Sequence, residues 1–458
     1  MYLARVTLRN IRGFSGARDV DLPLTRPDGS HAGWTVIAGR NGSGKTSLLR
    51  GIALAVSGPA VARSLVPDFE NWVTVGCREA SAQVRIAYDP VYDRFYGKGR
   101  LPARDFGAGL QWTYPDDRDD GADDGRRTNQ PSMAAAGSPS SRSQFVARGP
   151  WQDNPGGWFC AAYGPFRRLV GGAGDAQRLM LSPGPVARLV SLFHEDASLA
   201  EGVGWLIEQH LRTLEQRPGA EELKEAALEI LANGLLPDGY RIEKVDSDGL
   251  WVANGDKRFP LREMSDGYRT VAALVVDLLK QINDAYGTIP VNNDSGITAV
   301  TAPGVVIIDE VDAHLHVSWQ KRIGGWLKSH FPNIQFIVTT HSPYICQAAD
   351  PGGLIRLAGP DQEEPPSVVG QDLYERIVFG SGDDAVLSDL FGLDTPYSEK
   401  AQSLRRELVD LEVAVVSDVA DEEQERRYLQ LRELLESSPV ARVGEVTARL
   451  HEAGAAGA

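Results

Sequence analysis

Apolar and polar residues alternate along LARVTLRNIRGF, residues 3–14, and this period of two predicts a first β-strand followed by a turn. A second apolar run, WTVIAG at 34–39, has no polar face and predicts a buried strand that ends in glycine. Beyond Lys45 the apolar residues recur at the spacing of a helix that buries one side. The N-terminal region therefore predicts a strand, a glycine-rich turn and a helix in succession.

The centre of the chain changes character along its length. Residues 115–150 are acidic and then rich in Gly, Pro and Ser, with little to bury, so we expect a flexible surface insert. Helical spacing of apolar residues returns over 186–232. Residues 238–261 alternate again and contain Asp-Gly and Asn-Gly turns, which predicts a small β meander.

Two later runs are apolar on both faces and end in polar residues. The four apolar residues Val305 to Ile308 precede Asp309, and the segment NIQFIVTTHSPY contains a buried run that ends in Thr340 and His341. Runs of this kind are typical of central strands in a parallel sheet, which helices cover on both sides. Apolar residues at helical spacing also follow Ser265, so we expect a helix there with Ser265 at its N-cap.

The C-terminal region predicts a helical tail over 396–458. Its apolar residues fall on one face of each of two helices, with many charges between them: Leu404, Leu408, Leu411 and Val415, then Leu431 and Leu435. The chain length favours more than one lobe in the α/β head that precedes the tail. We expect this head to span 1–395, with a sheet lobe at about 1–112 and 300–380, a helical lobe at about 151–299 and the insert at about 115–150.

Composition narrows the class of protein. An apolar content of 42 % and a charged content of 24 % are ordinary for a globular chain. The formal net charge of −15 counts against a protein that coats nucleic acid, although a local basic groove stays compatible with it. Cys77, Cys160 and Cys346 are too far apart for a zinc ribbon or a disulfide framework. We found no signal peptide or membrane-spanning run, and expect a cytoplasmic protein without a membrane partner.

GRNGSGKT, residues 39–46, fits the phosphate-binding pattern G-x-x-x-x-G-K-[ST] after a buried strand and at the start of a helix. Glycine permits the close approach that a Cβ would block, so successive N–H groups and the helix N-terminus can surround a phosphate. Lys45 can bridge the β- and γ-phosphates of ATP, and the Thr46 hydroxyl can bind Mg²⁺. The expected nucleotide-binding residues are Asn41, Gly42, Ser43, Gly44, Lys45 and Thr46.

Asp309 and Glu310 follow a predicted central strand, at the edge where α/β sheets bind ligands. Asp309 can hold Mg²⁺ through water, and Glu310 can accept the proton of an attacking water. His341 ends the next predicted strand, where an imidazole can hydrogen-bond a γ-phosphate. The predicted catalytic residues are therefore Glu310, His341 and Lys45, and the predicted metal ligands are Thr46 and Asp309.

Other polar residues leave alternatives open. His314 and His316 would suit a metal pair, but without a suitable third ligand nearby we favour surface or interface histidines. Arg167 and Arg168 could contact nucleotide or nucleic acid, or form salt bridges between lobes. The segment Ser265, Asp266 and Gly267 either caps a helix or completes a γ-phosphate site with a second helix N-terminus, which a partner subunit must then supply.

The segments LRNIRGF, GRNGSGKT, EMSDGYRT, VVIIDEVDAHLH and QFIVTTHSP resemble the motifs of the RecF/SMC-like branch of ABC ATPases. The resemblance implies a two-lobed ABC-type P-loop ATPase head with a helical signature lobe. Such heads dimerise head to tail around bound ATP. It also implies that Ser265 and Gly267 contact the γ-phosphate across the dimer, that Asp309 serves Mg²⁺, that Glu310 is the base and that His341 is the switch histidine.

Within this branch the segments AAYGPFRRL, SDGYRTVAALVVDLL and DEVDAHLHVSWQKRI are similar to bacterial anti-phage ATPases of the Septu type and their retron-associated relatives. This resemblance covers most of residues 1–395 and implies an HNH-type nuclease partner. It leaves open a higher oligomer and contact with DNA or RNA through the complex. The sequence departs from the pattern in a signature that reads MSDGY rather than LSGGQ and in Val317, where many relatives have Pro. No residue can be assigned to the Gln-loop.

The expected function is an ATP-binding and ATP-hydrolysing dimeric switch that controls a partner nuclease in phage defence. The alternative is a RecF-like repair ATPase that binds DNA directly, which the net charge of −15 disfavours. A nuclease activity of its own is disfavoured because the tail lacks the carboxylate pattern of the nuclease domain in the overcoming-lysogenization-defect family. A transporter ATPase is disfavoured by the LRNIRGF and DAHLH segments.

Overall fold

The computed structural model describes residues 1–115, 130–136, 143–167, 174–182, 184–293, 296–393 and 395–435. The chain divides into two compact units, Met1–Tyr374 and Glu375–Ala458. This division falls upstream of the boundary that we expected near residue 395. Most of the insert expected at 115–150 lies outside the described residues, but its described parts contain a short strand and a short helix, β6 (Ser132–Ala135) and α2 (Ser143–Arg148).

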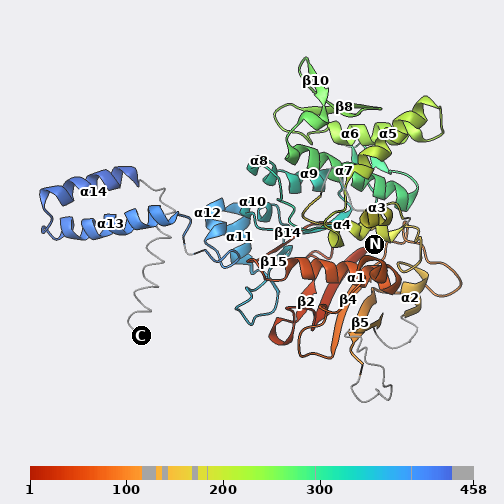
Figure 1. The fold of residues 1–458 in the computed structure, drawn as a ribbon, viewed down its shortest axis with the longest axis horizontal. Coiled ribbons are helices and arrows are strands. Elements are labelled where there is room, and N and C mark those ends of the chain that lie inside the picture. Colours follow the sequence, from red (N-terminus) through yellow and green to blue (C-terminus); the bar gives the residue numbers. More distant parts are fainter. Residues whose placement is uncertain are drawn as a thin grey trace. The chain divides into compact units, whose positions relative to one another are not determined.

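The larger unit is built around a six-stranded sheet in which, among the described strands, only the edge strand β16 runs antiparallel to its neighbour. Figure 1 labels two strands of this sheet, β14 and β15. In spatial order the strands are β16 (Ser367–Val368), β15 (Leu354–Arg356), β3 (Gly33–Ala38), β14 (Ile334–Thr340), β13 (Gly304–Ile308) and β7 (Cys160–Tyr163). The buried strands predicted at 34–39, at 305–308 and before His341 are confirmed. Residues 160–163, which we expected in the helical lobe, instead form β7 and pair with β13.

A second sheet is antiparallel and contains the alternating N-terminal strand. In spatial order its strands are β2 (Val20–Pro23), β1 (Tyr2–Arg9), β4 (Glu79–Ala87), β5 (Phe106–Thr113) and β6. The helix α1 (Lys45–Leu65) packs against β1, β4 and β5. Side chains of the parallel sheet, such as Ile37 and Ile307, join the same core as α1. The two sheets therefore share one hydrophobic core with α1.

The helix α1 bends in its second half, at Gly58 (φ 82°) and Pro59. A side chain at position 58 would meet the ring of Trp151 within 2.6 Å, and the indole N–H of Trp151 donates to the Val56 carbonyl at 3.0 Å. In length and apolar character α1 alone among the described helices could cross a membrane, yet 67 % of its most apolar stretch is buried inside the protein. Burial within the core accounts for its apolar sequence.

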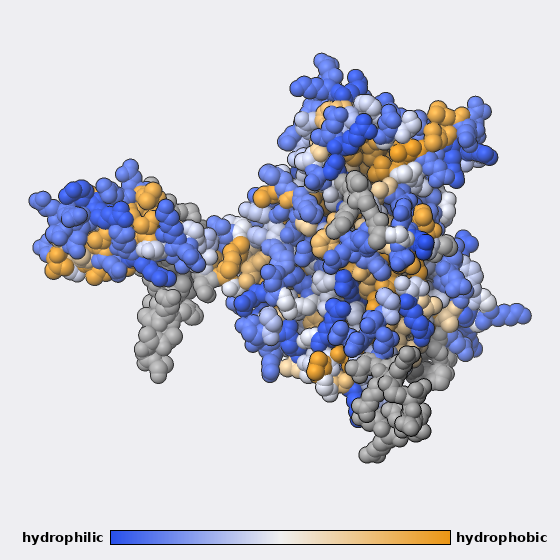
Figure 2. All heavy atoms as spheres, in the orientation of Figure 1, coloured by the Kyte–Doolittle hydropathy of each residue, from blue (hydrophilic) through white to orange (hydrophobic). Residues whose placement is uncertain are grey.

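The helical lobe carries the remaining predicted helices and the predicted β meander. Its main elements are α5 (Ala200–Leu214), α6 (Ala220–Ala232), α7 (Asp266–Tyr286) and the antiparallel strands β8 (Arg241–Asp246), β9 (Gly249–Asn254) and β10 (Lys257–Pro260). Leu211 and Leu214 near the end of α5 are exposed, and Figure 2 shows an apolar group over this part of a largely hydrophilic face. The predicted helical region at 186–232 and the meander at 238–261 are confirmed.

The shorter elements of the larger unit connect these layers. They are η1 (Gly16–Arg18), α3 (Gly174–Met180), α4 (Pro185–Phe193), η2 (Leu261–Glu263), β11 (Val291–Asn292), β12 (Ala299–Val300), α8 (Val317–Gln320), α9 (Ile323–His330) and α10 (Pro343–Cys346). The helix α9 packs against β3, where Gly324 allows a close approach to Trp34. This contact helps to cover the face of the parallel sheet opposite to α1.

A buried hydrogen bond joins the helical lobe to the parallel sheet. The Tyr163 hydroxyl, at the end of β7, donates to the Asp277 carboxylate in the middle of α7 at 2.9 Å. Asp277 is only 2 % exposed, and burial raises the pKa of its carboxyl group. The backbone of α5 comes so close at Gly202 that a Cβ there would lie 2.8 Å from Asp277. The centre of α7 is therefore fixed both to the sheet and to its neighbouring helix.

The described residues of the second unit are mainly helical, as expected of the tail. It contains α12 (Gly382–Val386), α13 (Glu399–Val416) and α14 (Glu422–Leu434), and α11 (Gln371–Phe379) spans the boundary between the units. Arg427 of α14 pairs with Glu407 of α13 at 2.7 Å. The predicted apolar faces lie between these two helices, where Leu431 is fully buried. The helix pair is thus held by an apolar seam and a surface ion pair.

Gln335 connects the two sheets inside the core. This β14 residue is fully buried, and its side chain accepts from Leu3 N–H at 2.7 Å and donates to the Leu3 carbonyl at 2.9 Å. The amide thus bonds the backbone of β1 as a neighbouring strand would. The pairing of β1 with β4 is irregular just beyond Leu3. The side chain therefore satisfies backbone groups that would otherwise be buried without partners.

We predict that Gln335→Leu lowers the free energy of unfolding by about 2 to 5 kcal/mol, because each buried backbone group left without a partner costs about 1–3 kcal/mol. Urea unfolding followed by tryptophan fluorescence measures this change. Gln83→Leu is the matched control, since Gln83 is exposed on β4 and such a surface change falls within about 0.5 kcal/mol of wild type. Equal stability of the two variants would contradict the role assigned to Gln335.

Candidate nucleotide-binding site

Four neighbouring parallel strands end at one edge of the sheet, and each is followed by a polar segment. The loop 39–44 follows β3, Asp309 and Glu310 follow β13, His341 follows β14, and Arg167 lies shortly after β7. Carboxyl ends of parallel strands meet at the same edge, so these segments gather there. The order of the strands, with β14 between β3 and β13, thus assembles the site from distant parts of the sequence.

The loop 39–44 has the conformation that its glycines predict. Gly42 and Gly44 adopt φ angles of 78° and 98°, which L side chains rarely tolerate. A Cβ on Gly39 would lie 2.7 Å from the Leu357 carbonyl, and one on Gly44 would lie 2.7 Å from the Phe14 ring. Asn41 and Gly42 are exposed at the tip of the loop, whereas Ser43 is buried. The packing of this loop therefore admits little beyond glycine at these positions.

Lys45 begins α1 and stays close to the loop. Its ammonium donates to the carbonyls of Gly39 at 2.9 Å and Arg40 at 3.1 Å, and the residue is 7 % exposed. Burial lowers the pKa of Lys45, and the carboxylates of Asp309 and Glu310 oppose this shift. The predicted catalytic lysine is thus held at the loop and faces the predicted acidic pair.

Asp309 lies at the centre of the site and is 1 % exposed. The Thr46 hydroxyl donates to its Oδ2 at 2.6 Å, and the Thr339 hydroxyl donates to its Oδ1 at 2.5 Å. The two residues predicted as metal ligands, Thr46 and Asp309, are therefore in direct contact. A carboxylate and a hydroxyl are oxygen ligands of the kind that Mg²⁺ prefers.

Glu310 adopts the left-handed backbone conformation, with φ 46°, directly after Asp309. Its N–H donates to the Thr339 hydroxyl at 2.8 Å. Its carboxylate makes no hydrogen bond or ion pair with another residue in the described part of the chain. The side chain is therefore free to accept a proton from a water molecule, as a general base must.

His341 is exposed just beyond β14. The part of the ring that is nevertheless buried, and the nearby Lys45 ammonium, lower the pKa of His341. The carboxylates of Asp312, Glu310 and Asp309 oppose that shift. A lowered pKa keeps the imidazole neutral near pH 7, in which state one ring nitrogen donates and the other accepts. His341 thus faces the same cluster of charges as Lys45.

The segment Ser265–Gly267 stands apart from this cluster. Ser265 occupies the predicted N-cap position of α7, but its hydroxyl makes no capping bond, contrary to the usual behaviour of an N-cap serine. Ser265 and Asp266 are exposed, and Asp266 pairs with Arg269. No interaction joins Ser265, Asp266 or Gly267 to the loop 39–46 within the ranges that the structure describes.

Gly267 packs against the turn that follows the acidic pair. A Cβ at this position would lie 2.3 Å from the carbonyl oxygen of His314. Close packing within one chain therefore requires glycine here, whatever Gly267 contacts in a partner. The start of α7 and the turn 309–315 are in direct contact through this glycine.

Sequence reasoning missed the partners that hold the acidic pair in place. Thr339 bonds both Asp309 and Glu310, and the neighbouring Thr340 hydroxyl donates to Asp312 at 2.5 Å. Adjacent threonines at the end of an otherwise apolar strand were the available signal. Arg167 donates to the carbonyls of Asp309, Glu310 and Ala313 rather than forming a salt bridge, and Arg168 lies outside the described residues.

The histidine pair has no metal-binding geometry. His316 caps α8, with its Nδ1 near the Ser318 amide and hydroxyl, and His314 adopts φ 65° in the preceding turn. Across the described ranges, no group of three His, Cys, Asp or Glu side chains could hold a metal ion. The zinc alternative therefore has no structural support in this part of the chain.

Two family models match the chain. The model described as "AAA domain, putative AbiEii toxin, Type IV TA system" matches residues 211–347, which contain Ser265, Asp309 and His341. A second AAA domain model matches residues 5–102, which contain the loop before α1. Together the matches cover both halves of the candidate site, and AAA domains are nucleotide-binding modules.

Curated relatives come from bacterial Septu and retron systems. The Septu protein PtuA of Bacillus mycoides is 25 % identical over 386 residues, covering 84 % of this chain and 44 % of that protein. PtuA of Bacillus thuringiensis is 32 % identical over 165 residues, which cover 35 % of this chain and 40 % of that protein. The Retron Ec83 probable ATPase of Escherichia coli is 40 % identical over 88 residues, 19 % of this chain and 15 % of that protein. The chain spans less than half the length of each of these relatives.

Solved structures of SMC heads are more distant. The Smc head bound to the C-terminal winged-helix domain of ScpA matches with a TM-score of 0.44 and 17 % identity, over 81 % of this chain and 98 % of that chain. The SMC head domain from Thermotoga maritima matches with a TM-score of 0.40 and 16 % identity, over 81 % of this chain and 100 % of that chain. Scores this low decide nothing, so the fold assignment rests on strand order and motif positions. The strand order and the motif positions are those of a P-loop ATPase fold, and the chain is similar to AAA domain models and to the Septu and retron ATPases.

Proposed function

We propose that this protein binds and hydrolyses ATP with Mg²⁺ as a head-to-tail dimer, and that the cycle controls a partner nuclease in bacterial defence against phage. The observation that carries the ATPase proposal is the contact of Thr46 with Asp309 beside the buried Lys45 and the unpaired Glu310 carboxylate. These groups have the chemistry that phosphoryl transfer to water requires.

The loop 39–44 and the start of α1 suit a polyphosphate. Backbone N–H groups at the N-terminus of a long helix attract anions, and the glycines of the loop allow phosphate oxygens to approach the backbone. Lys45 supplies a cation beside the loop carbonyls. These features support binding of the ATP phosphates along residues 39–46.

The contact between Thr46 Oγ1 and Asp309 Oδ2 supports a Mg²⁺ site at the same place. Mg²⁺ in nucleotide sites is held by one or two such oxygen groups together with the phosphates and water. When bound, the ion would neutralise negative charge that develops on the phosphate oxygens. Thr339 keeps the Asp309 carboxylate oriented through its other oxygen.

The proposed reaction assigns a proton acceptor to the chain. Water attacks the γ-phosphorus, the bond between that phosphorus and the oxygen bridging to the β-phosphate breaks, and ADP and inorganic phosphate form. Glu310 accepts the proton of the attacking water. Neutral His341 donates a hydrogen bond to the γ-phosphate, and Lys45 stabilises charge on the β and γ oxygens.

The start of α7 supports the dimer proposal. Ser265 and Asp266 are exposed and have no contact with the loop 39–46 within the described residues. The Ser265 hydroxyl makes no capping bond, so it is free to donate to an oxygen of another molecule. A helix N-terminus attracts the negative charge of a γ-phosphate. A second copy in head-to-tail arrangement would bring this segment to the ATP.

The nuclease partner rests on relatives rather than on a contact within the chain. The Septu protein PtuA of Bacillus mycoides matches over 84 % of this chain, but the chain covers 44 % of that protein. An HNH-type nuclease is the partner that the Septu resemblance implies. We therefore propose it as the partner and make its presence the outcome of an experiment below.

Thr339→Val tests the Mg²⁺ site. The change removes the hydroxyl that bonds Asp309 and Glu310, and loss of such an outer contact lowers metal affinity about 10- to 100-fold. We expect ATP affinity to fall about tenfold or more in Mg²⁺ and to stay unchanged in EDTA, as measured with a fluorescent ATP analogue. Thr301→Val, at the opposite end of β13, is the control. An equal loss with and without Mg²⁺ would contradict the assignment.

A mixture of two inactive variants tests the composite site. Lys45→Ala disables the phosphate-binding loop 39–46, and Ser265→Arg prevents the segment Ser265–Gly267 from reaching the partner's ATP. Each variant alone should therefore have no ATP turnover. If the signature acts on the partner's ATP, a mixed dimer regains one complete site, and mixing should restore a measurable fraction of wild-type turnover. Mixing Lys45→Ala with Thr46→Val, which both damage the P-loop, should restore none. Absence of recovery from the first mixture would rule out action in trans.

Glu310→Gln tests the base and the dimer. Removal of a general base lowers turnover about 10²- to 10⁴-fold. Because hydrolysis is blocked while ATP binding is kept, we expect light scattering to show an ATP-dependent dimer that persists. A variant that stays monomeric at saturating ATP would contradict the dimer.

The same variant tests the proposed partner. Affinity purification of Glu310→Gln with ATP and Mg²⁺, followed by mass spectrometry, should recover an HNH nuclease. Recovery of DNA without a nuclease would favour the RecF-like alternative.

A further inference from the structure

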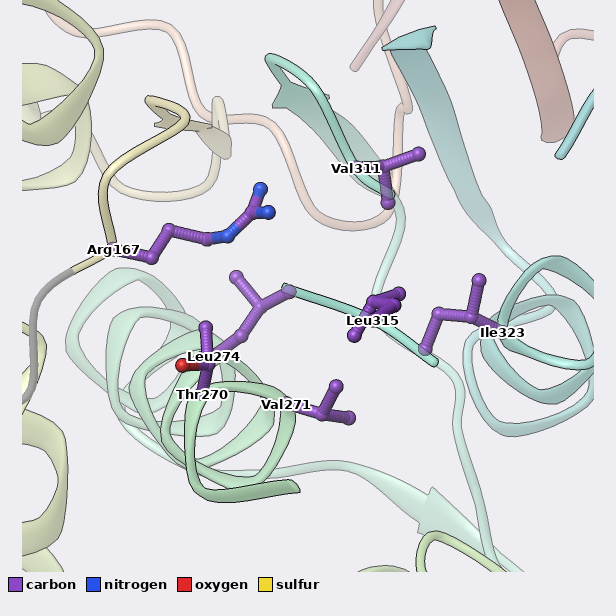
Figure 3. A pocket seen from close by; sticks show the side chains of 7 residues that line it. All are labelled: Arg167, Thr270, Val271, Leu274, Val311, Leu315 and Ile323. Atoms are coloured by element: carbon purple, nitrogen blue, oxygen red, sulfur yellow. The ribbon is translucent and has the colours of Figure 1, made fainter. Parts of the chain in front are cut away.

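Arg167 occupies the loop that flanks the acidic pair on the side away from the P-loop. The strand β7 pairs with β13, and the loop after it runs through Gly164, Pro165 and Phe166 before reaching Arg167. Figure 3 shows the Arg167 side chain reaching from this loop toward the segment that carries Val311.

Within the described part of the chain, the guanidinium of Arg167 binds only backbone oxygens. Its NH1 group donates to the Asp309 carbonyl at 3.1 Å, and its NH2 group donates to the carbonyls of Glu310 at 2.9 Å and Ala313 at 3.3 Å. The residue is 4 % exposed. Burial lowers its pKa to about 10, so the side chain keeps its charge near pH 7. A buried cation is thus dedicated to the turn that contains Glu310.

The turn needs such support because its backbone is strained at both ends. Glu310 has φ 46° and His314 has φ 65°, a region that is unfavourable for residues with a Cβ. Left-handed residues of this kind persist only where the surroundings fix them. The carbonyls that Arg167 binds belong to this turn, so its bonds oppose relaxation of the turn to ordinary dihedral angles.

Arg167 complements a second set of restraints. The turn's N–H groups are held from β14, because Glu310 N–H donates to the Thr339 hydroxyl and Val311 N–H donates to the Thr339 carbonyl at 3.0 Å. Arg167 holds the carbonyls from the side of β7. Each peptide plane around Glu310 is therefore fixed from two neighbouring strands, and the direction of the Glu310 side chain follows from that of its backbone.

The same turn is also in contact with α7. The His314 carbonyl lies against Gly267, and a small hollow is lined by Arg167, by Thr270, Val271 and Leu274 of α7, and by Val311, Leu315 and Ile323 (Figure 3). Arg167 therefore lies where movement of α7 would reach the turn.

We propose that Arg167 is a positioning residue that holds Glu310 in its catalytic orientation by fixing the carbonyls of the turn 309–315. The proposal rests on the proposed ATPase function, and it deepens that function by assigning the loop after β7 to control of the base. Arg167 acts on turnover through Glu310 and does not bind the nucleotide. Its planar fork holds the Asp309 carbonyl on one nitrogen and the Glu310 and Ala313 carbonyls on the other, a fixed spacing that the single nitrogen of a lysine ammonium does not provide.

Arg167→Lys tests this role while keeping the positive charge. Misplacement of a reacting group by about 1 Å can cost about 100-fold in rate, so we expect kcat to fall about tenfold or more, with KM and ATP affinity within about threefold of wild type. Arg188→Lys is the matched control, since Arg188 is 3 % exposed on α4 and packs over the Phe159 ring at 5.9 Å. Its kcat should stay at the wild-type level. A loss of ATP affinity equal to the loss of kcat in Arg167→Lys would overturn the proposal.

A double-mutant comparison shows whether Arg167 acts through Glu310. In a Glu310→Gln background the base is already absent, so Arg167→Lys should cause no further loss in single-turnover hydrolysis of labelled ATP. A further loss as large as that seen in the wild-type background would mean that Arg167 acts elsewhere, and the proposal would be wrong.

Hydrogen–deuterium exchange provides a readout that needs no activity. We expect Arg167→Lys to speed exchange in peptides covering the turn 309–315 and to leave those covering the loop 39–46 unchanged. Unchanged exchange in the turn would overturn the proposal even if catalysis were impaired. If the wild-type protein does not hydrolyse ATP, the proposed function fails, and this measurement still decides whether Arg167 holds the turn.

Discussion

The carboxylate of Asp309 is the group on which the arrangement of this site depends. A buried carboxylate is costly unless hydrogen bonds compensate for the lost water. Here the hydroxyls of Thr46 and Thr339 bond its two oxygens, and they come from the helix after β3 and from β14. The three strand ends must keep their order and register for these bonds to form. The charge therefore ties the P-loop, the acidic pair and the strand between them into one unit.

The same strand ends connect this unit to the helical lobe. The Asp309 N–H donates to the Tyr163 carbonyl at 2.8 Å, and the Tyr163 hydroxyl donates to Asp277 in the middle of α7. At its start, α7 meets the turn after Glu310 through Gly267. The helix that carries the exposed Ser265 is thus joined to the acidic pair at two points. These contacts are a physical route by which a shift of α7 would alter the orientation of Glu310, the proposed base.

Local patterns made much of this structure predictable, and long-range neighbours account for what was missed. The P-loop, the central strands and α7 follow from residue types at fixed spacing, which act within a few residues of chain. The run Cys160–Tyr163 is too short to show a recognisable spacing of residue types. It belongs to the sheet because it pairs with β13. Arg167 and Gln335 bind backbone groups far away in sequence. Every residue has a backbone carbonyl, and all but proline have an N–H, so the sequence does not indicate which of these groups a side chain binds. Within the predicted insert, β6 is a strand because it pairs with β5, which is also a neighbour that the local sequence does not reveal.

The contact between Gly267 and His314 bears on how substitutions at this position would be tolerated. A single subunit already excludes every side chain at position 267, because a Cβ would collide with a backbone oxygen that cannot move aside without disturbing the turn. Selection on folding alone would therefore keep glycine there, even in a relative that does not form the proposed dimer. Packing within the subunit and the proposed contact with a partner's nucleotide would both select for glycine at position 267. Loss of either requirement alone would leave the glycine in place. Ser265 is exposed and its hydroxyl makes no capping bond, so folding does not protect this position in the same way, and it would be free to change in a relative without the proposed dimer.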